Sequence, residues 1–361
     1  MRLALVTATP QTVHTGSGTF VALATLTQGL RALGHRVETI APSRNAPPFG
    51  YTVHRFGFNR ALSPRHIGSA DVVVGWDMDG YRLAGRCPVP FVSYVHGQLA
   101  DEARFERGLV ALSMRLQARA ERRSVLRAGA VLTVSEHARR RLAASYGIPG
   151  ERIAVVPPAF DGDRWRAALA AAPGSSAGGR PTVLCVARLY PRKDVATLLR
   201  GTAILRRDVP DLLVRVVGDG PERRRLVALA RALTLEGTVE FSGQVPFRKL
   251  AAAYASCDVF CLPSRQEGFG IVFLEAMAAA RPIVTCRGTA AEELVPHGRD
   301  GLLVPQQDPA ALAAALRVLL ADPELRRKLG AGGPARVRGF APEPIARRFL
   351  DALPKPAGGP S

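Results

Sequence analysis

The sequence predicts an α/β protein made of two doubly wound domains, and three observations support this fold class. Short apolar runs alternate along the whole chain with longer segments of helical period, which is the pattern of parallel strands covered by helices. The alternation is interrupted once, at 171–181, by a linker-like stretch of alanine, glycine, serine and proline. The 361 residues, 47% of them hydrophobic, suffice for two cores. We therefore expect one domain over 1–160 and a second over 161–341.

The apolar and helical periods predict the elements of each domain. The strands expected in the first domain are 3–7, 37–40, 52–56, 71–75, 89–95, 130–134 and 153–156, with helices at 18–33, 103–128 and 136–146. The strands expected in the second domain are 182–187, 212–217, 239–241, 258–262, 282–285 and 301–304, again with helices between them. A last helix at 342–352 is expected to cross back onto the first domain.

The chain is strongly basic, and its charge is spread evenly. The formal net charge is +19, and only four of the 49 basic residues are lysines. Residues 1–160 carry 20 basic and 10 acidic side chains, and residues 161–361 carry 29 and 20. No basic tail, zinc finger or RNA-binding motif accompanies this excess. We therefore expect anionic small molecules or an anionic membrane surface as partners, and no nucleic acid.

The cysteines and the lengths of the apolar runs indicate a cytoplasmic protein. The five cysteines are scattered, form no CxxC pair and mostly stand in apolar runs, which favours buried thiols in a reducing compartment. No run of ~18 uncharged apolar residues occurs, so we expect no membrane-spanning helix. The first residues also lack the regions of a signal peptide.

The strongest motif follows the predicted strand at 258–262. Glu267 lies in the turn after this strand, and an amphipathic helix opens near Gly270 with Glu275 in its second turn. Backbone amides at a helix N-terminus donate to anions, and Gly268 and Gly270 let a ligand approach the main chain closely. Carboxylates accept hydrogen bonds from paired hydroxyls. Taken alone, the segment is either a ligand site or a strand–loop–helix unit with solvated glutamates.

Glu267 and Glu275 stand eight residues apart around Gly-Phe-Gly, which resembles the E-x7-E signature of retaining GT-B glycosyltransferases of family 4. The resemblance covers nearly the whole second half and, more loosely, the first. It implies that Glu267 binds hydroxyls of the donor sugar and that Glu275 binds the ribose of the nucleotide. It also implies that backbone around the motif approaches the sugar and phosphates, namely Gly268, Phe269, Gly270 and Ile271.

A second element supports the resemblance. Arg188-Leu189-Tyr190-Pro191-Arg192-Lys193 follows the first predicted strand of the second domain and is similar to the family's G-R-L-x-x-x-K-G element. In that family the Arg and Lys neutralise the donor diphosphate, which implies this role for Arg188 and Lys193. Two fixed cations would stabilise the charge that grows on the departing nucleotide. Ala187 and Asp194 replace the family's two glycines without removing a cation.

Weaker matches stand where the family has further donor contacts. Gly218 begins a G-D-G-P turn, and Val245 lies in a segment whose backbone contacts the nucleobase in the family. Gly16 and Gly18 belong to a glycine loop that faces the donor phosphates in the family. His96 ends a predicted strand where the family often has a histidine close to the transferred sugar. The resemblance therefore implies a catalytic set of four side chains, His96, Arg188, Lys193 and Glu267.

The resemblance implies a GT-B arrangement, in which two Rossmann-like domains face each other across a cleft. The second domain would hold a UDP- or GDP-sugar, and the first would bring a lipid, glycan or small-molecule acceptor. It further implies retention at the anomeric carbon, with front-face attack assisted by the leaving phosphate. Asp77 and Asp79 have DxD spacing but lie in the first domain, so we expect no metal cofactor.

Three other functions remain open at this point. The chain could be a nucleotide-sugar epimerase or hydrolase on the same fold, although no acid–base set for such chemistry is evident. It could be a nucleotide-sugar-binding protein without activity, against which the intact Arg188, Lys193, Glu267 and Glu275 argue. A nucleic-acid-binding protein is the most distant alternative.

The segment 104–127 has its own pattern, with seven arginines and two glutamates. At 100° per residue one face collects Arg104, Arg107, Arg115, Arg119 and Arg122, and a second face collects Phe105, Leu109, Leu112 and Leu116. The first interpretation is a surface helix that packs its apolar face on the sheet and leaves its basic face solvated. The second is peripheral docking onto anionic lipid headgroups.

Overall fold

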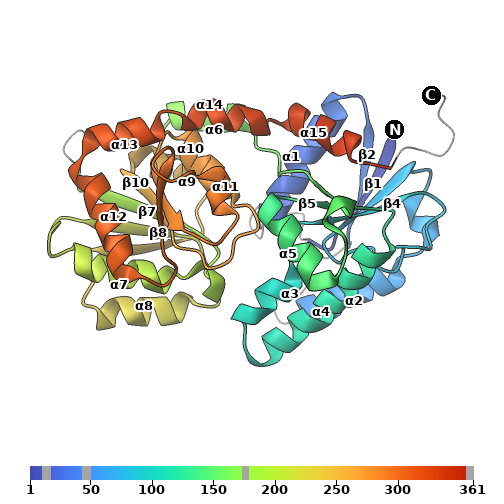
Figure 1. Cartoon of the computed structure of the whole chain (residues 1–361), viewed down its shortest axis with the longest axis horizontal. Helices are drawn as coiled ribbons and strands as arrows, with labels where there is room; N and C mark the ends of the chain where they lie inside the picture. The colour runs from blue at the N-terminus through green and yellow to red at the C-terminus, as the bar shows by residue number, and fades with distance from the viewer. Residues whose placement is uncertain (10–17, 43–49, 173–178, 355–361) are drawn as a thin grey trace. The chain divides into compact units, whose positions relative to one another are not determined.

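The computed structural model describes residues 1–9, 18–42, 50–172 and 179–354. The chain forms two compact units, Met1–Phe160 with Phe340–Ser361, and Asp161–Gly339 (Figure 1). Most of the predicted linker, residues 173–178, lies outside the described residues, as do residues 355–361 and Gly16.

The first domain is built on six parallel strands in the order β2-β1-β3-β4-β5-β6. The strands are β1 (Arg2–Val6), β2 (Arg36–Ile40), β3 (Val72–Trp76), β4 (Phe91–Val95), β5 (Ala130–Thr133) and β6 (Ile153–Val155). The α-helices are α1 (Gly18–Ala32), α2 (Tyr51–Ala61), α3 (Leu99–Glu102), α4 (Gly108–Arg127), α5 (Glu136–Tyr146) and α15 (Pro342–Asp351). Short 3-10 turns are Pro64–Ile67, Ala103–Phe105, Gly150–Arg152 and Val337–Phe340. The strand order reverses between β1 and β3, which makes this pair the switch point of the sheet.

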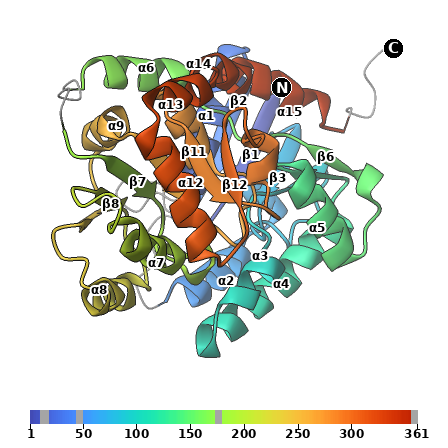
Figure 2. The same ribbon diagram turned by 60° about the vertical axis from the view of Figure 1, so that its left-hand side comes forward.

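The last helix, α15, packs along α1 of the first domain, and both views show the two helices side by side (Figures 1 and 2). Gly29 makes the approach possible, because a Cβ at this position would lie 2.2 Å from the Pro342 carbonyl oxygen. Phe349 is fully buried against Tyr94, with the ring centroids 5.9 Å apart. The C-terminal segment is thus part of the core of the first domain.

The second domain is built on six parallel strands in the order β12-β11-β10-β7-β8-β9. The strands are β7 (Thr182–Val186), β8 (Leu213–Val217), β9 (Val239–Gly243), β10 (Val259–Leu262), β11 (Ile283–Cys286) and β12 (Gly301–Val304). The α-helices are α6 (Gly162–Ala170), α7 (Val195–Leu205), α8 (Arg223–Ala232), α9 (Phe247–Ser256), α10 (Ile271–Ala278), α11 (Ala291–Leu294), α12 (Pro309–Ala321), α13 (Pro323–Gly330) and α14 (Gly333–Arg336). Pro191–Lys193 forms a 3-10 turn. Here the switch point lies between β7 and β10.

Twelve of the thirteen predicted strands are confirmed, and the predicted strand at 52–56 is wrong because this segment lies inside the helix α2. Arg55 and Asn59, four residues apart, are buried on one face of α2, while Val53 is 78% exposed. The β-branched residues of this segment favour a strand, but the buried polar contacts of Arg55 and Asn59, spaced at helical period, determine a helix.

The predicted helix at 103–128 is shorter, since α4 begins at Gly108, and Arg104 and Arg107 precede it. The prediction that Leu109, Leu112 and Leu116 pack on the sheet is also wrong, because all three are exposed.

The cysteines are free thiols, and Cys185, Cys257, Cys261 and Cys286 are buried. No helix within the described ranges is both long enough and apolar enough to cross a membrane.

Candidate active site

A cation and a carboxylate meet across the switch point of the second sheet. Lys193 lies in the turn after β7, and Glu267 lies in the loop after β10. Lys193 Nζ donates to Glu267 Oε2 over 2.5 Å, and their side chains are only 13% and 10% exposed. Because neighbouring parallel strands end at the same edge, residues 74 apart in sequence become partners.

The loop after β10 is tied to its neighbours by further hydrogen bonds. Ser264 Oγ lies 3.4 Å from Glu267 Oε2, and the Arg265 amide donates to the Arg192 carbonyl over 2.8 Å. The Ala290 amide donates to the Glu267 carbonyl over 3.3 Å. The main chain that carries Glu267 is therefore fixed by the loops after β7 and β11.

Arg188 stands beside this pair in sequence but makes no ion pair within the described part of the chain. It follows β7 directly, is partly exposed, and its guanidinium lies 5.8 Å from the centroid of the Tyr190 ring. A cation without a carboxylate partner at the carboxyl edge of a parallel sheet can accept an anionic ligand.

The helix α10 begins directly after this loop and carries Glu275. Gly270 at its start has φ +92°, and a Cβ there would lie 2.4 Å from the Phe273 ring, so the turn requires glycine. The Tyr254 hydroxyl donates to Glu275 Oε2 over 2.8 Å. Burial raises the pKa of Glu275 to about 7, and the Tyr254 hydrogen bond offsets part of this effect. The Glu275 carboxyl therefore titrates near neutral pH in the free protein.

The remaining predicted donor residues of this domain lie at the same edge. Phe269 is buried in the loop, and Gly268, next to it, is partly buried. Ile271 opens α10, and Val245 lies between β9 and α9, partly buried. The geometry thus places the backbone of the predicted donor segments around the ends of β9 and β10.

Gly218 has a structural role that accounts for its residue type. Its φ is +125°, and a Cβ would lie 1.9 Å from the Ala187 carbonyl oxygen. Its amide already donates to the Gly243 carbonyl over 2.7 Å. Gly218 therefore lets the chains after β7, β8 and β9 approach each other closely.

Asp194 takes the left-handed conformation for which the family has glycine. Its φ is +46°, and its side chain accepts a hydrogen bond of 2.8 Å from the Thr197 hydroxyl. Aspartate is one of the residue types that tolerate this region. The departure from the family pattern therefore preserves the start of α7.

In the first domain, His96 follows β4, and its ring clusters with the rings of Trp76 and Tyr94, which also contact each other. The ring centroids are 4.5 Å from Trp76 and 4.2 Å from Tyr94. The His96 amide donates to Asp77 Oδ1 over 2.7 Å, and its buried Nε2 has no hydrogen-bond partner within the described residues. Burial lowers the pKa of His96 to about 3, so the ring is neutral. Gly18, the other predicted residue of this domain that is described, begins α1 and is exposed.

Asp79 forms a buried polar network in the first domain that the sequence does not predict beyond the DxD spacing. Asp79 is completely buried after β3. Its Oδ1 accepts from Arg55 Nε and from the Asn59 amide group, each over 2.9 Å. Its Oδ2 accepts from the Ala8 amide over 2.7 Å and from Arg55 over 3.1 Å. Both oxygens are therefore committed to joining β1, α2 and β3.

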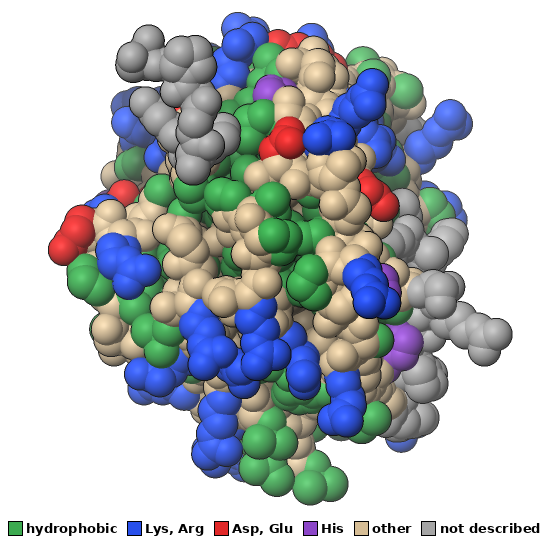
Figure 3. Space-filling view, turned by 90° about the vertical axis from the view of Figure 1, so that its right-hand side faces the viewer, with side chains coloured by type: hydrophobic (Ala, Val, Ile, Leu, Met, Phe, Trp, Pro, Cys, Tyr) green, Lys and Arg blue, Asp and Glu red, His purple; other side chains and the backbone are tan. Residues whose placement is uncertain are grey.

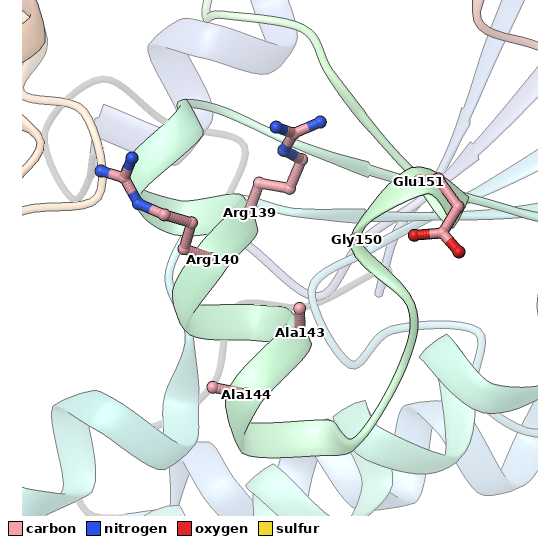
Figure 4. Close-up of a pocket in the computed structure, with 6 residues that line it drawn as sticks. All are labelled: Arg139, Arg140, Ala143, Ala144, Gly150 and Glu151. Carbon is pink, nitrogen blue, oxygen red and sulfur yellow. The ribbon is translucent and has the colours of Figure 1, made fainter.

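A hollow on the first domain lies between α5 and the turn Gly150–Arg152. It is lined by Arg139, Arg140, Ala143, Ala144, Gly150 and Glu151 (Figure 4). The two guanidinium groups point in different directions in Figure 4, and Arg139 is paired with Glu136 over 2.7 Å. No polar groups converge on this hollow.

Solved structures with the GT-B fold share the architecture of this chain. The chain resembles the sucrose-phosphate synthase from Thermosynechococcus elongatus, with a TM-score of 0.82 and 23% identity over 97% of each chain. It also resembles a glycosyltransferase involved in lipopolysaccharide biosynthesis, with a TM-score of 0.72 and 18% identity over 98% of this chain and 100% of that chain. The family model "Glycosyltransferase Family 4" matches residues 16–164, and the model "Glycosyl transferases group 1" matches residues 171–336. The chain belongs to the glycosyltransferases that these two models describe.

Curated relatives share substantial identity over part of their length. A GDP-mannose-dependent alpha-(1-6)-phosphatidylinositol monomannoside mannosyltransferase of Mycolicibacterium smegmatis is 37% identical over 57% of this chain and 56% of the relative. A D-inositol 3-phosphate glycosyltransferase of Kineococcus radiotolerans is 34% identical over 72% of this chain and 65% of the relative. The chain spans 56% to 59% of the length of the mycobacterial mannosyltransferases that it matches.

Proposed function

We propose that the protein is a retaining glycosyltransferase that moves a hexose from a nucleoside diphosphate sugar, with GDP-mannose favoured, onto a lipid acceptor. The observation that carries the proposal is the Lys193–Glu267 pair across the switch point of the second sheet. Arg188, which follows the same strand as Lys193, adds a cation that has no ion-pair partner among the described residues. The mycobacterial relatives named for GDP-mannose and a phosphatidylinositol lipid favour this donor and this acceptor class.

The proposed reaction breaks the bond between the anomeric carbon and the donor diphosphate. Negative charge grows on the leaving phosphate, and Arg188 and Lys193 stabilise it. Stabilisation of developing charge by fixed charges is usually the largest single contribution to enzymatic rate enhancement. The acceptor hydroxyl attacks from the same face, forms the new glycosidic bond and passes its proton to a leaving phosphate oxygen. Since two cations supply the positive charge, we expect activity to persist in a chelator such as EDTA.

The pairing of Lys193 with Glu267 suggests how the charge of Lys193 is balanced before the donor binds. A buried cation without a partner would be costly, and Glu267 neutralises it. On donor binding the diphosphate takes over part of this role, and Glu267 turns its carboxylate to hydroxyls of the sugar. Glu275 is proposed to bind the ribose, with the Tyr254 hydroxyl orienting its carboxylate.

Substitution of the two glutamates should affect nucleotide binding differently, and this difference tests the assignment without knowledge of the acceptor. Calorimetry with GDP and UDP measures nucleotide binding in the absence of a sugar. Glu267→Gln should bind nucleoside diphosphate nearly as well as the native protein, and Glu275→Gln should bind it ~10-fold more weakly, as expected for the loss of hydrogen bonds worth ~1.4 kcal/mol. Glu236→Gln, on an exposed turn of the same domain, is the matched control. Equal losses in both site variants would mean that the roles are wrongly assigned.

A nucleotide-sugar hydrolase on this fold is the second candidate, and product analysis separates the two. A hydrolase releases GDP and free mannose at the same rate with or without acceptor. The transferase proposed here should release GDP slowly until an acceptor lipid is added. Detection of an epimerised nucleotide sugar would contradict both.

A further inference from the structure

The helix α4 exposes large apolar side chains over its first turns. Leu109 is 83% exposed, Val110 55%, Leu112 53% and Leu116 43%. Soluble proteins rarely group apolar side chains on one surface unless that surface binds something. Figure 3 shows hydrophobic side chains projecting at the lower end of this face, with lysine and arginine side chains grouped above them.

Apart from Leu126, which is 39% exposed, the large exposed side chains on the rest of the solvent face of α4 are basic. The exposed arginines are Arg115, Arg119, Arg122, Arg123 and Arg127. None of them forms an ion pair within the described part of the chain, and the one acidic residue of the helix, Glu121, is completely buried. Elsewhere on the surface many arginines have partners, for example Arg166 with Asp163 and Arg327 with Glu324. The outer face of α4 therefore carries unneutralised positive charge.

The inner face of α4 carries three buried polar side chains among alanines and a valine, and their hydrogen bonds hold the helix in this orientation. Gln117 accepts a hydrogen bond from Arg55 over 3.2 Å, and Ser124 lies 3.3 Å from the Ser93 hydroxyl. Glu121 accepts from the Leu99 amide over 3.2 Å. Rotation of the helix to bury the leucines would break these buried contacts, so the leucines are held toward solvent.

We propose that the solvent face of α4 docks on an anionic lipid bilayer, with the leucines of its first turns inserted and its arginines at the headgroups. The leucines occupy the N-terminal part of the helix and the arginines extend over ~18 Å from Arg115 to Arg127 at 1.5 Å per residue. An apolar end beside a basic stretch is the pattern of helices that lie in the membrane interface. The charge is opposite to that of anionic lipids, and no exposed acid on α4 opposes it. The proposed surface includes none of the residues assigned to donor binding, so its test is independent of the proposed transferase activity.

The test is co-sedimentation of the full chain with vesicles of phosphatidylcholine alone or with 30% phosphatidylglycerol, at low salt and at ~0.5 M salt. The native protein should sediment with the anionic vesicles at low salt, and much less with neutral vesicles or at high salt. The triple variant Arg115→Gln, Arg119→Gln, Arg122→Gln should bind ~100-fold more weakly, since each basic residue contributes ~1 kcal/mol near such a surface. The triple variant Leu109→Ser, Leu112→Ser, Leu116→Ser should bind at least ~10-fold more weakly with the charge unchanged.

Matched controls use exposed side chains of the second domain that lie outside the proposed surface. Arg224→Gln, Arg231→Gln, Arg248→Gln removes the same charge, and Ile204→Ser, Val318→Ser removes exposed apolar groups. Both control proteins should sediment like the native protein, and GDP binding should be unchanged in all variants. Three results would overturn the proposal: native binding by the arginine variant, native binding by the leucine variant, or a native dimer that the leucine variant converts to a monomer without any vesicle binding.

Discussion

The two sheets treat the carboxyl side of their switch points differently. In the first domain the gap between β1 and β3 is bridged by Asp79, whose carboxylate accepts from the Ala8 amide and from the buried side chains of Arg55 and Asn59. In the second domain the loops after β7 and β10 are joined by the side-chain contact of Lys193 with Glu267 and by the hydrogen bond from the Arg265 amide to the Arg192 carbonyl. Arg188, on the loop after β7, makes no ion pair within the described residues. The first arrangement uses all its acceptors within the fold, and the second retains charge that a ligand can use.

This difference gives the two switch points different roles: the polar network at the first stabilises the fold, and the ion pair at the second can respond to a ligand. A carboxylate with four hydrogen bonds in a fully buried setting stabilises the loops and has no capacity left for a ligand. A lysine and a glutamate that are each about a tenth exposed can exchange partners when an anion enters. Substitutions at the first switch point should therefore change stability, and substitutions at the second should change activity.

The largest expected effect is the loss of Asp79. Asp79→Ala leaves the Arg55 guanidinium buried without its partner and removes the acceptor of the Ala8 amide, so we expect unfolding to become easier by ~3–5 kcal/mol. Chemical denaturation of the native protein and the variant measures this. Asp71→Ala, at an exposed carboxylate of the same domain, is the control and should leave the free energy of unfolding nearly unchanged. A stable Asp79→Ala protein would mean that the network is dispensable.

The next effect is the loss of Arg188, which should appear in catalysis and not in stability. Arg188 makes no ion pair within the described residues, so Arg188→Gln should leave the unfolding free energy nearly unchanged. If Arg188 stabilises the leaving diphosphate, kcat should fall by ~10²–10³-fold. Arg231→Gln, an exposed arginine of α8, should have native kcat. A change in the donor KM with native kcat would instead assign Arg188 to ground-state binding.

A smaller effect concerns the stability of the free protein at Glu275. Its pKa is raised from 4.5 to about 7, so between these pH values the folded carboxyl keeps a proton that the unfolded chain has lost. The native protein should therefore lose stability as pH rises from 4.5 to 7, by as much as ~3 kcal/mol. Glu275→Gln should not, and thermal melts at pH 5 and pH 8 should show its advantage growing with pH. The same gain in Glu236→Gln would show that the effect is not local to the Tyr254 contact.

The sequence predicted the fold and the positions of the site residues because both depend on strand ends. Glu267 and Lys193 each follow a predicted parallel strand, so the edge on which they lie could be inferred. Their direct pairing could not, because β7 and β10 become neighbours only through the strand order of the folded sheet. Strand order is a property of the tertiary structure, and hydrophobic periodicity in the sequence does not reveal it.

The failures have a common physical cause. Periodicity states which residues share a face of an element and does not state which face is buried. In α4 the first interpretation placed the leucines against the sheet, but the buried face holds Gln117, Glu121 and Ser124 among smaller apolar side chains. Each of these three polar side chains has a hydrogen-bond partner. In α2 the buried Arg55 and Asn59 face Asp79, a contact that apolar patterning cannot predict. Satisfied polar groups thus replaced apolar ones at both sites.

The smallest expected effect is at His96, which follows β4 and whose buried Nε2 has no hydrogen-bond partner within the described residues. Burial lowers its pKa to about 3, so the ring is neutral at working pH and can contribute a hydrogen bond but not a charge. His96→Gln should lower kcat by ~5-fold, corresponding to ~1 kcal/mol, and leave the shape of the pH–rate profile between pH 5.5 and 8 unchanged.

The pH dependence of stability gives a second test of His96, with a definite sign. A lowered histidine pKa contributes stability that is complete above pH 6.5 and is lost as pH falls toward 3, so the native protein should lose more stability than His96→Gln between pH 7 and pH 4. If the native pH–rate profile instead shows an inflection near pH 6.5 that His96→Gln lacks, then His96 titrates during catalysis. In that case the burial of His96 in the free protein differs from its environment in the enzyme–substrate complex.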